Sequence, residues 1–182
     1  ASFSASGTHF LLKNKKKHQG QFLHLESGNS LKLTNLKDVY FSKLTANAVV
    51  VLQSDPGAEL QVLNLDGFQV TQKLKTTGTF RAIHWNPNGK SFTVLREEEN
   101  NNSLLYVDLE TGVFTLNEYE LDEYSFYKGS SADFGISTDN RRVFFKAVPR
   151  VETTAALDTS QLANVQVWKA SAPWTEIESP NY

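Results

Sequence analysis

The sequence contains no cysteine, which excludes disulfide bonds, thiol catalysis and thiolate metal sites. It also contains no methionine, and it begins at Ala1 without a charged and apolar leader segment. We therefore interpret the chain as a fragment or processed piece of a longer protein. No apolar run reaches the length of about eighteen residues that a membrane-spanning helix requires, so we expect no membrane span.

A strong net charge is missing as well. Eighteen basic and twenty acidic side chains give a formal net charge of −2 at pH 7. Nucleic acids and anionic membranes attract proteins through positive charge, so we expect neither as a partner. Hydrophobic residues make up 40% of the chain and aromatic residues 12%, which is enough to bury a substantial core. The composition indicates a globular module.

No recognisable catalytic or metal-binding arrangement is present in the sequence. No glycine begins the G-x-S-x-G pentad that presents a serine nucleophile, and the nearest candidate, residues 28–32, ends in lysine. Neither a His-x-x-x-His pair nor a carboxylate-rich calcium loop occurs. The histidines are His9, His18, His24 and His84, without a Ser-Asp-His layout. We expect no catalysis by this chain alone, no metal and no cofactor.

Two polar residues within strand-like runs have a structural interpretation. His24 alternates with apolar residues, as a strand histidine with a local hydrogen-bond partner does. Asp108 directly precedes a turn, where a carboxylate can accept hydrogen bonds from the following backbone amides. We therefore expect both side chains to stabilise local structure.

A phrase recurs about every forty residues: a turn, an apolar strand, a second strand and a further turn. It is clearest in the third copy, where residues 84–90 lead into a strand at 92–95, and a strand at 104–109 leads into the turn at 110–112. The first turns of the copies end at Gly7, Asn47, Gly89 and Asn140, with steps of 40, 42 and 51 residues. A period in this range indicates a repeat architecture.

The turns have the residues that hairpins require. Pro87 and Gly89 suit positions i+1 and i+3 of a type I turn. Gly28, Gly67 and Gly112 can take positive φ at the second hairpin of their copies. Between the turns, β-branched and aromatic residues dominate runs of about four to seven residues, a length typical of strands.

Four copies of such a unit predict an all-β fold, a β-propeller of about four four-stranded antiparallel blades that forms part of a larger propeller. We place the chain in a single propeller segment, 1–182, with blade-like repeats at approximately 1–37, 38–77, 78–123 and 124–182. A β-sandwich is the main alternative, because short strands with frequent turns suit that fold too. Trp85 ends the first strand of its repeat, so we expect it to be buried and its replacement by alanine to cost about 3–5 kcal/mol.

The turn and strand phrases at 86–95 and 105–112 resemble those of the non-catalytic propeller in the prolyl oligopeptidase family of serine peptidases, especially its large bacterial members. The pattern at 135–145, followed by an insertion and a strand at 165–168, is similar too. The resemblance implies a module that gates or positions peptide substrate for, or docks onto, an α/β-hydrolase domain absent from this chain. The implied partners are that domain or the rest of the parent polypeptide, and the implied location is periplasmic or secreted.

A stand-alone periplasmic propeller that acts as a scaffold for protein–protein contacts is the alternative function. Related turn and strand phrases occur in many periplasmic propellers without a peptidase. A half-propeller would expose a blade face rich in Phe and Val, and would therefore self-associate or require its missing half.

Carboxylates and aromatic residues alternate at 117–127, between the third and fourth repeats. The candidate substrate or partner contacts in this segment are Glu118, Glu120, Asp122, Glu123, Tyr124 and Tyr127. In the dipeptidyl-peptidase branch of the resembled family, paired glutamates hold the amino terminus of a peptide. This sequence has Asp122-Glu123 instead of two glutamates, and an inter-blade crossing with packed aromatic residues is the alternative.

Three other loops have simpler interpretations. Lys13 to His18 form either a small anion site or a solvated hairpin tip. Residues 96–102 are expected to be a flexible, solvated tip. The long insertion at 148–164 is expected to be functional or mobile.

Overall fold

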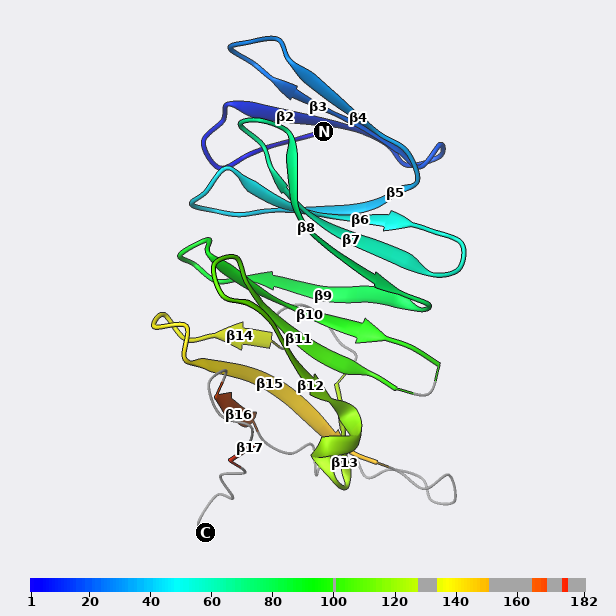
Figure 1. Cartoon of the computed structure of the whole chain (residues 1–182), viewed down its shortest axis with the longest axis vertical. Coiled ribbons are helices and arrows are strands. Elements are labelled where there is room, and N and C mark those ends of the chain that lie inside the picture. The colour runs from blue at the N-terminus through cyan, green and yellow to red at the C-terminus, as the bar shows by residue number, and fades with distance from the viewer. Residues whose placement is uncertain (100, 128–133, 151–164, 170–174, 177–182) are drawn as a thin grey trace. The chain divides into compact units, whose positions relative to one another are not determined.

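The computed structural model describes residues 1–99, 101–127, 134–150, 165–169 and 175–176 (Figure 1). Nearly all of its secondary structure is antiparallel sheet. Sheet 1 contains β1 (Ser2–Phe3), β2 (His9–Asn14), β3 (Gln19–His24) and β4 (Ser30–Leu33). Sheet 2 contains β5 (Leu36–Phe41), β6 (Asn47–Gln53), β7 (Ala58–Asn64) and β8 (Gln69–Thr76). In both sheets each strand pairs with the next strand in sequence.

Sheet 3 repeats this pattern with β9 (Thr79–Trp85), β10 (Ser91–Glu97), β11 (Ser103–Asp108) and β12 (Gly112–Asn117). Sheet 4 contains β13 (Tyr124–Phe126), β14 (Phe134–Ile136), β15 (Arg142–Pro149), β16 (Val165–Lys169) and β17 (Thr175–Glu176). Because β13 and β14 pair with successive parts of β15, they occupy one strand position. A short 3-10 helix, η1 (Glu118–Leu121), precedes β13. The four antiparallel meanders confirm the predicted blade pattern.

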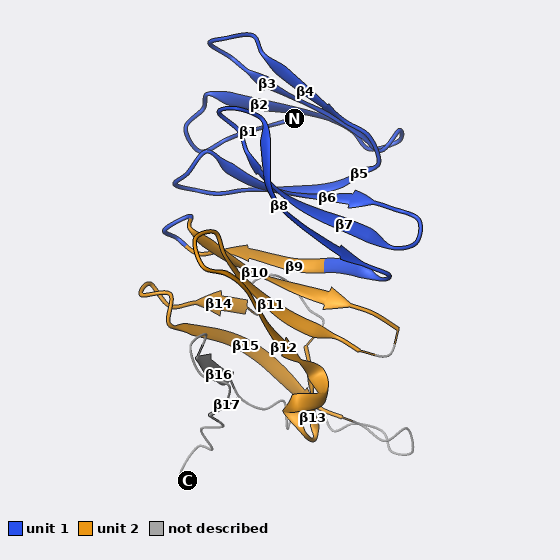
Figure 2. Ribbon diagram, viewed as in Figure 1, with its two compact units in different colours: residues 1–80, 87–89 blue, residues 81–86, 90–182 orange. Residues whose placement is uncertain are grey.

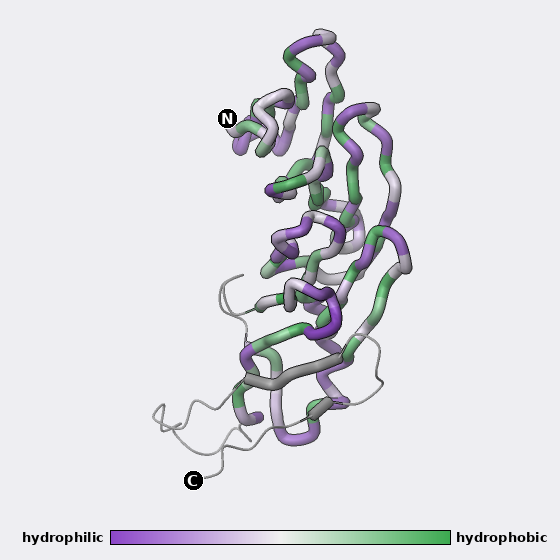
Figure 3. The backbone as a smooth tube through the Cα atoms, turned by 90° about the vertical axis from the view of Figure 1, so that its left-hand side faces the viewer, coloured by the Kyte–Doolittle hydropathy of each residue, from purple (hydrophilic) through white to green (hydrophobic). Residues whose placement is uncertain are grey.

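The chain forms two compact units, unit 1 with residues 1–80 and 87–89 and unit 2 with residues 81–86 and 90–182 (Figure 2). Sheets 1 and 2 pack face to face within unit 1. The buried residues between them are Leu11, Phe22, Leu36, Ala48, Val50, Leu63 and Leu65. They alternate with more exposed residues along the strands, as the two-residue period of a strand requires. Figure 3 shows hydrophobic and hydrophilic stretches interspersed along the described chain.

Unit 2 has a core of its own between sheets 3 and 4. Sheet 3 contributes Leu95, Leu104, Tyr106 and Leu116, and the segment from η1 to β15 contributes Leu121, Phe126, Phe134, Ile136, Val143, Phe145 and Ala147. Each fully buried leucine, valine or phenylalanine stabilises the fold by about 1.5–3 kcal/mol, so packing between neighbouring sheets supplies most of the stability.

The turn predictions are confirmed in part. Gly28 and Gly112 have φ of 72° and 109°, but the prediction for Gly67 is wrong. In that hairpin the positive φ, 51°, falls on Phe68. A non-glycine residue is strained in this region, and the Phe68 ring offsets the strain by packing near Phe22 and His9 in the unit 1 core.

Gly89 ends the turn between β9 and β10 and has a φ of 71°. A Cβ atom at this position would lie 2.5 Å from Ser42 Oγ and 2.9 Å from Thr45 Cγ2. The Thr45 hydroxyl donates a hydrogen bond of 3.1 Å to the Gly89 carbonyl. Glycine is therefore required both by the backbone conformation and by the close approach of a second turn.

The predicted burial of Trp85 is wrong. The residue does end β9, but its side chain is only partly buried, with its ring centroid 5.0 Å from that of Phe92. Phe92, on the adjacent strand, is the fully buried partner. The expected cost of Trp85→Ala falls accordingly, because a partly buried aromatic side chain loses less on truncation than a core side chain.

Candidate functional site

The segment between sheets 3 and 4 turns sharply at η1. Asn117 precedes the helix, and its backbone amide donates a hydrogen bond of 2.6 Å to Glu120 Oε2. Asp122, directly after the helix, has a φ of 48°. Glu120 is therefore engaged in fixing the start of the helix, in the manner of a capping box.

Glu118 connects three parts of unit 2. Its Oε1 atom accepts a hydrogen bond of 2.9 Å from the Phe126 amide, and its Oε2 atom accepts one of 2.5 Å from Asn102 Nδ2. The Glu118 amide in turn donates to the Asn102 carbonyl at 2.8 Å. The carboxylate thus ties the start of η1 to β13 and to the loop before β11.

The loop before β11 departs from the expected solvated tip. Asn102 is only 9% exposed, and Arg96 donates a 3.0 Å hydrogen bond to the buried Ser103. Glu97 forms an ion pair of 2.9 Å with Arg81. The prediction of a solvated tip is wrong for these residues because their polar groups are used in hydrogen bonds and ion pairs.

Arg150, which directly follows β15, holds the same turn by donating hydrogen bonds to the carbonyl groups of turn residues. Its amide donates to the Glu123 carbonyl at 2.6 Å, and its Nε atom donates to the Tyr124 carbonyl at 2.9 Å. A further guanidinium nitrogen donates to the Glu118 carbonyl. Arg150 and Asn102 were missed by sequence reasoning, because neither stands in a recognisable motif.

The remaining candidate residues differ in accessibility. Asp122 and Glu123 are exposed, and neither carboxylate has a hydrogen bond or ion pair with another described residue. Tyr124 is partly buried beside the unit 2 core. The ammonium group of Lys146 lies 4.2 Å from the centre of the Tyr127 ring, in a cation–π contact. Among the candidate residues, the consecutive carboxylates Asp122 and Glu123 are exposed and have no partner among the described residues, whereas the exposed Glu120 carboxylate is engaged with the Asn117 amide.

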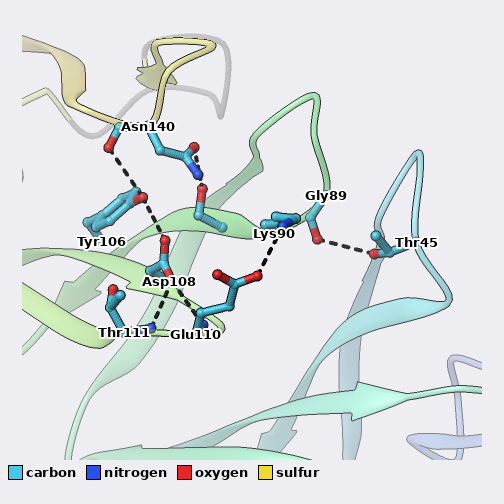
Figure 4. Close-up of polar contacts among 9 residues, drawn as sticks. Thr45, Gly89, Lys90, Tyr106, Asp108, Glu110, Thr111 and Asn140 are labelled. Carbon is cyan, nitrogen blue, oxygen red and sulfur yellow. Dashed lines mark hydrogen bonds and ion pairs between the residues drawn. The ribbon is translucent and has the colours of Figure 1, made fainter.

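Asp108 and His24 have the local partners expected of them. Asp108 Oδ1 accepts hydrogen bonds of 2.9 Å from the Glu110 and Thr111 amides, and the Tyr106 hydroxyl donates to Oδ2 at 3.3 Å (Figure 4). Burial acts to raise the pKa of the Asp108 carboxyl, but the bonds from the two amides outweigh it and lower the pKa below its usual value. His24 Nδ1 accepts a 3.1 Å hydrogen bond from the Ser27 amide.

Turns of neighbouring sheets in unit 2 are joined by polar contacts. Asn86 Nδ2 donates to the Ser137 carbonyl at 3.1 Å, and Ser91 Oγ donates to Asn140 Oδ1 at 2.9 Å. The Tyr106 hydroxyl also lies 3.5 Å from the Asn140 carbonyl (Figure 4). The turn residues that mark the sequence repeat therefore also bind one sheet to the next.

The basic residues of the β2–β3 hairpin in sheet 1 differ in their exposure and in their partners. Lys13 Nζ forms an ion pair of 2.8 Å with Asp38 Oδ1 and is only 19% exposed. The residues from Lys15 to His18 are exposed. Lys13 therefore joins sheets 1 and 2, while the other cations form the exposed tip.

Unit 1 also has an open apolar face, which we call the outer face of sheet 1. It carries Phe3, Phe10, Leu12 and Leu23 on the side of the sheet opposite the core. Phe3 is 59% exposed and Leu12 is 50% exposed. A hollow of about 530 Å³ lies beside Leu12, with Gln21 and Lys32 in its lining.

Three further expectations concern the long insertion, metal binding and membrane spans. Most of the insertion at 148–164 lies outside the described residues. Among the residues that the structure describes, no three histidine, aspartate or glutamate side chains are placed to hold a metal ion. No helix in the described part of the chain is long and apolar enough to cross a membrane.

The sequence matches no protein-family model and no curated protein. Solved structures are similar to most of the chain. TolB from Acinetobacter baumannii matches 98% of it with a TM-score of 0.50 and 14% identity. The tricorn protease matches 84% with a TM-score of 0.55 and 18% identity, and the β-propeller domain of the Trilobed protease from Pyrococcus furiosus matches 87% with a TM-score of 0.54 and 11% identity.

The chain spans 42%, 14% and 48% of these three proteins, in the same order. Identities this low show the fold alone. Together with the four antiparallel meanders, the likeness shows that the chain has a propeller-type fold and forms part of a β-propeller.

Proposed function

We propose that this chain is a non-catalytic propeller segment that positions peptide substrate for a serine peptidase α/β-hydrolase domain. The observation that carries the proposal is the exposed pair Asp122–Glu123 on a turn whose backbone is held from both sides. The similarity of the fold to propellers of the tricorn and Trilobed proteases also supports it. The hydrolase domain belongs to the parent polypeptide or to a partner.

The turn suits recognition of a peptide amino terminus. The ammonium group of that terminus is a donor with a positive charge, and two adjacent carboxylates offer complementary acceptors. Arg150 binds the Glu123 and Tyr124 carbonyls, so the carboxylates are carried on a backbone that needs little ordering on binding. Glu118 and Glu120 contribute indirectly, because their carboxylates are engaged in holding the turn.

Replacing both carboxylates tests the proposal in the peptidase that contains this chain. The double substitution Asp122→Asn with Glu123→Gln should raise KM for peptides with a free amino terminus about three- to tenfold and leave kcat unchanged. Exposed ion pairs are worth about 0.2–1 kcal/mol each, and loss of uniform binding changes KM alone. Steady-state kinetics with matched free and N-acetylated peptides provide the measurement.

The acetylated peptides should be cleaved equally well by the original and the substituted enzyme. Glu26→Gln with Asp55→Asn is the matched control, because it removes two exposed carboxylates from unit 1. An equal rise in KM for free and acetylated peptides would contradict amino-terminal recognition. A parent polypeptide without any hydrolase partner would remove the peptidase role altogether.

The outer face of sheet 1 favours a second candidate function, a scaffold for protein contacts. Four strands spaced about 4.8 Å apart and about 17 Å long present a face of roughly 300 Å². A stable interface buries about 800 Å² on each partner, so this face alone supports only weak association. A further blade of the parent propeller would cover it more firmly, because a connected blade has a high effective concentration.

Weak self-association of the 182-residue chain is therefore expected. It should appear in sedimentation velocity as a concentration-dependent shift at tens to hundreds of micromolar, and Leu12→Lys should weaken it at least fivefold by placing a charge on the apolar face. Leu44→Lys is the matched control, because Leu44 is 71% exposed but belongs to a sheet 2 turn. A chain that stays monomeric at all these concentrations would count against the scaffold role.

A further inference from the structure

His9 occupies an unusual position for an ionisable residue. It is the first residue of β2, its side chain is fully buried, and it faces the core between sheets 1 and 2. Its ring lies edge-on to the His24 ring at 4.6 Å and to the Phe68 ring at 6.0 Å. Because His9 and His24 are directly paired across β2 and β3, the register of sheet 1 keeps the two imidazoles together.

The surroundings of the two rings differ in their effect on charge. The Ser27 amide donates to His24 Nδ1, which requires that this nitrogen carry no proton. Burial lowers the pKa of His9, and the nearby His24 lowers it further. The Asp66 carboxylate and the Leu65 carbonyl raise the pKa of His9, but the two lowering effects are larger, so the pKa stays below its usual value.

The turn between β7 and β8 supplies Phe68, the sheet 2 residue whose ring contacts His9. Phe68 reaches into the core from a strained backbone position and packs near both His9 and Phe22. Sheet 1 therefore meets sheet 2 through an aromatic cluster that includes one buried imidazole. A charge on that imidazole would have to be desolvated within this cluster.

We propose that His9 and His24 form a pH-sensitive latch that holds sheet 1 against the turn of sheet 2 in unit 1 and releases it on acidification. Release would expose the face of sheet 1 that carries Leu11 and Phe22, which are buried in the core of unit 1 when the latch is closed. Such a latch would regulate the fold of unit 1 independently of any peptide-binding role.

A proton can reach the buried ring through hydroxyl groups. Ser4, Ser6 and Thr8 form a chain of hydrogen bonds of 3.1 and 2.7 Å, and Thr8 Oγ1 lies 2.9 Å from His9 Nδ1. Ser6 is exposed, so the chain leads from solvent to the imidazole.

The direction of the pH effect follows from the lowered pKa. The unfolded or opened state binds a proton on His9 at its usual pKa of about 6.5, and the closed state binds it only at lower pH. Closure is thus fully stable above about pH 6.5 and weakens as the pH falls from there toward the lowered pKa. The proton taken up by the open state raises its population by at most about tenfold per pH unit in that range.

Hydrogen exchange measured by mass spectrometry tests the latch in the full chain. Corrected for the pH dependence of chemical exchange, opening of β2 and β3 should rise between pH 7.5 and 5.5, by at most about tenfold. His9→Phe should abolish this rise, because phenylalanine keeps the aromatic packing and cannot bind a proton. His18→Gln should retain it, because His18 lies on the exposed hairpin tip.

A measurement on the unsubstituted chain guards against a His9→Phe variant that fails to fold. Imidazole nitrogen shifts should show His9 less protonated at pH 6.0 than an ordinary histidine, which is mostly charged at that pH. The latch is refuted if His9 in the folded chain is as fully protonated at pH 6.0 as an ordinary histidine. It is equally refuted if His9→Phe retains the rise in opening seen in the unsubstituted chain.

Discussion

Replacing Phe22 by alanine should lower the free energy of unfolding of unit 1 by about 3–5 kcal/mol. The side chain is fully buried, and its ring packs at 5.9 Å from Phe41 and 6.4 Å from Phe68. Truncation removes the largest side chain that sheet 1 gives to this core and leaves a cavity that the twisted sheets cannot easily close. Urea titration, with hydrogen exchange of β3 to locate the loss, provides the measurement.

Two aromatic substitutions are matched controls for Phe22→Ala. Phe3→Ala, on the open face of the same sheet, should cost less than about 1 kcal/mol because Phe3 is 59% exposed. Trp85→Ala should fall between the two, at about 1–2 kcal/mol, because its side chain is only partly buried. Equal losses for Phe22 and Phe3 would mean that sheet 1 does not pack on sheet 2 through this face.

The sequence was most informative where local chemistry determines structure. Pro87 and Gly89 predict a turn from their own backbone preferences, and the alternation of apolar residues predicts strands of period two. Such signals repeat with each blade, so the blade pattern could be recognised before the structure was known. Gly67 shows the limit of this reasoning, because packing of Phe68 in the core moved the positive φ by one residue.

The candidate site was less predictable because its partners are distant in sequence. Alternating carboxylates marked the segment 117–127, but the sequence could not distinguish Glu118, which binds Asn102 and the Phe126 amide, from the exposed Asp122. Arg150 directly follows a strand of the next sheet, far from the turn in sequence. Such assignments depend on the three-dimensional register of sheets 3 and 4.

Replacing Glu118 by alanine should cost about 2–4 kcal/mol in the free energy of unfolding of unit 2. The substitution leaves the Phe126 amide and Asn102 Nδ2 without their acceptor, and both residues are buried. Each buried donor left unpaired costs about 1–3 kcal/mol, so the expected loss is large for a residue that is not in the apolar core. Urea titration gives the total, and exchange of the amides in β13 shows whether the loss begins at this contact.

Glu120→Ala is the control that separates loss of the Glu118 contacts with Asn102 and the Phe126 amide from the general effect of removing a carboxylate. Its carboxylate accepts one exposed backbone amide, so its loss should cost only about 1 kcal/mol. Glu118→Gln should lie between the two, because the amide keeps one acceptor oxygen but presents a donor group toward Asn102. If Glu118→Ala and Glu120→Ala cost the same small amount, Glu118 does not anchor β13, and a direct contact with substrate becomes the better account of its position. If the order is as expected, the turn that carries Asp122 and Glu123 owes its geometry to the contacts of Glu118, and the exposed pair is left accessible to a ligand.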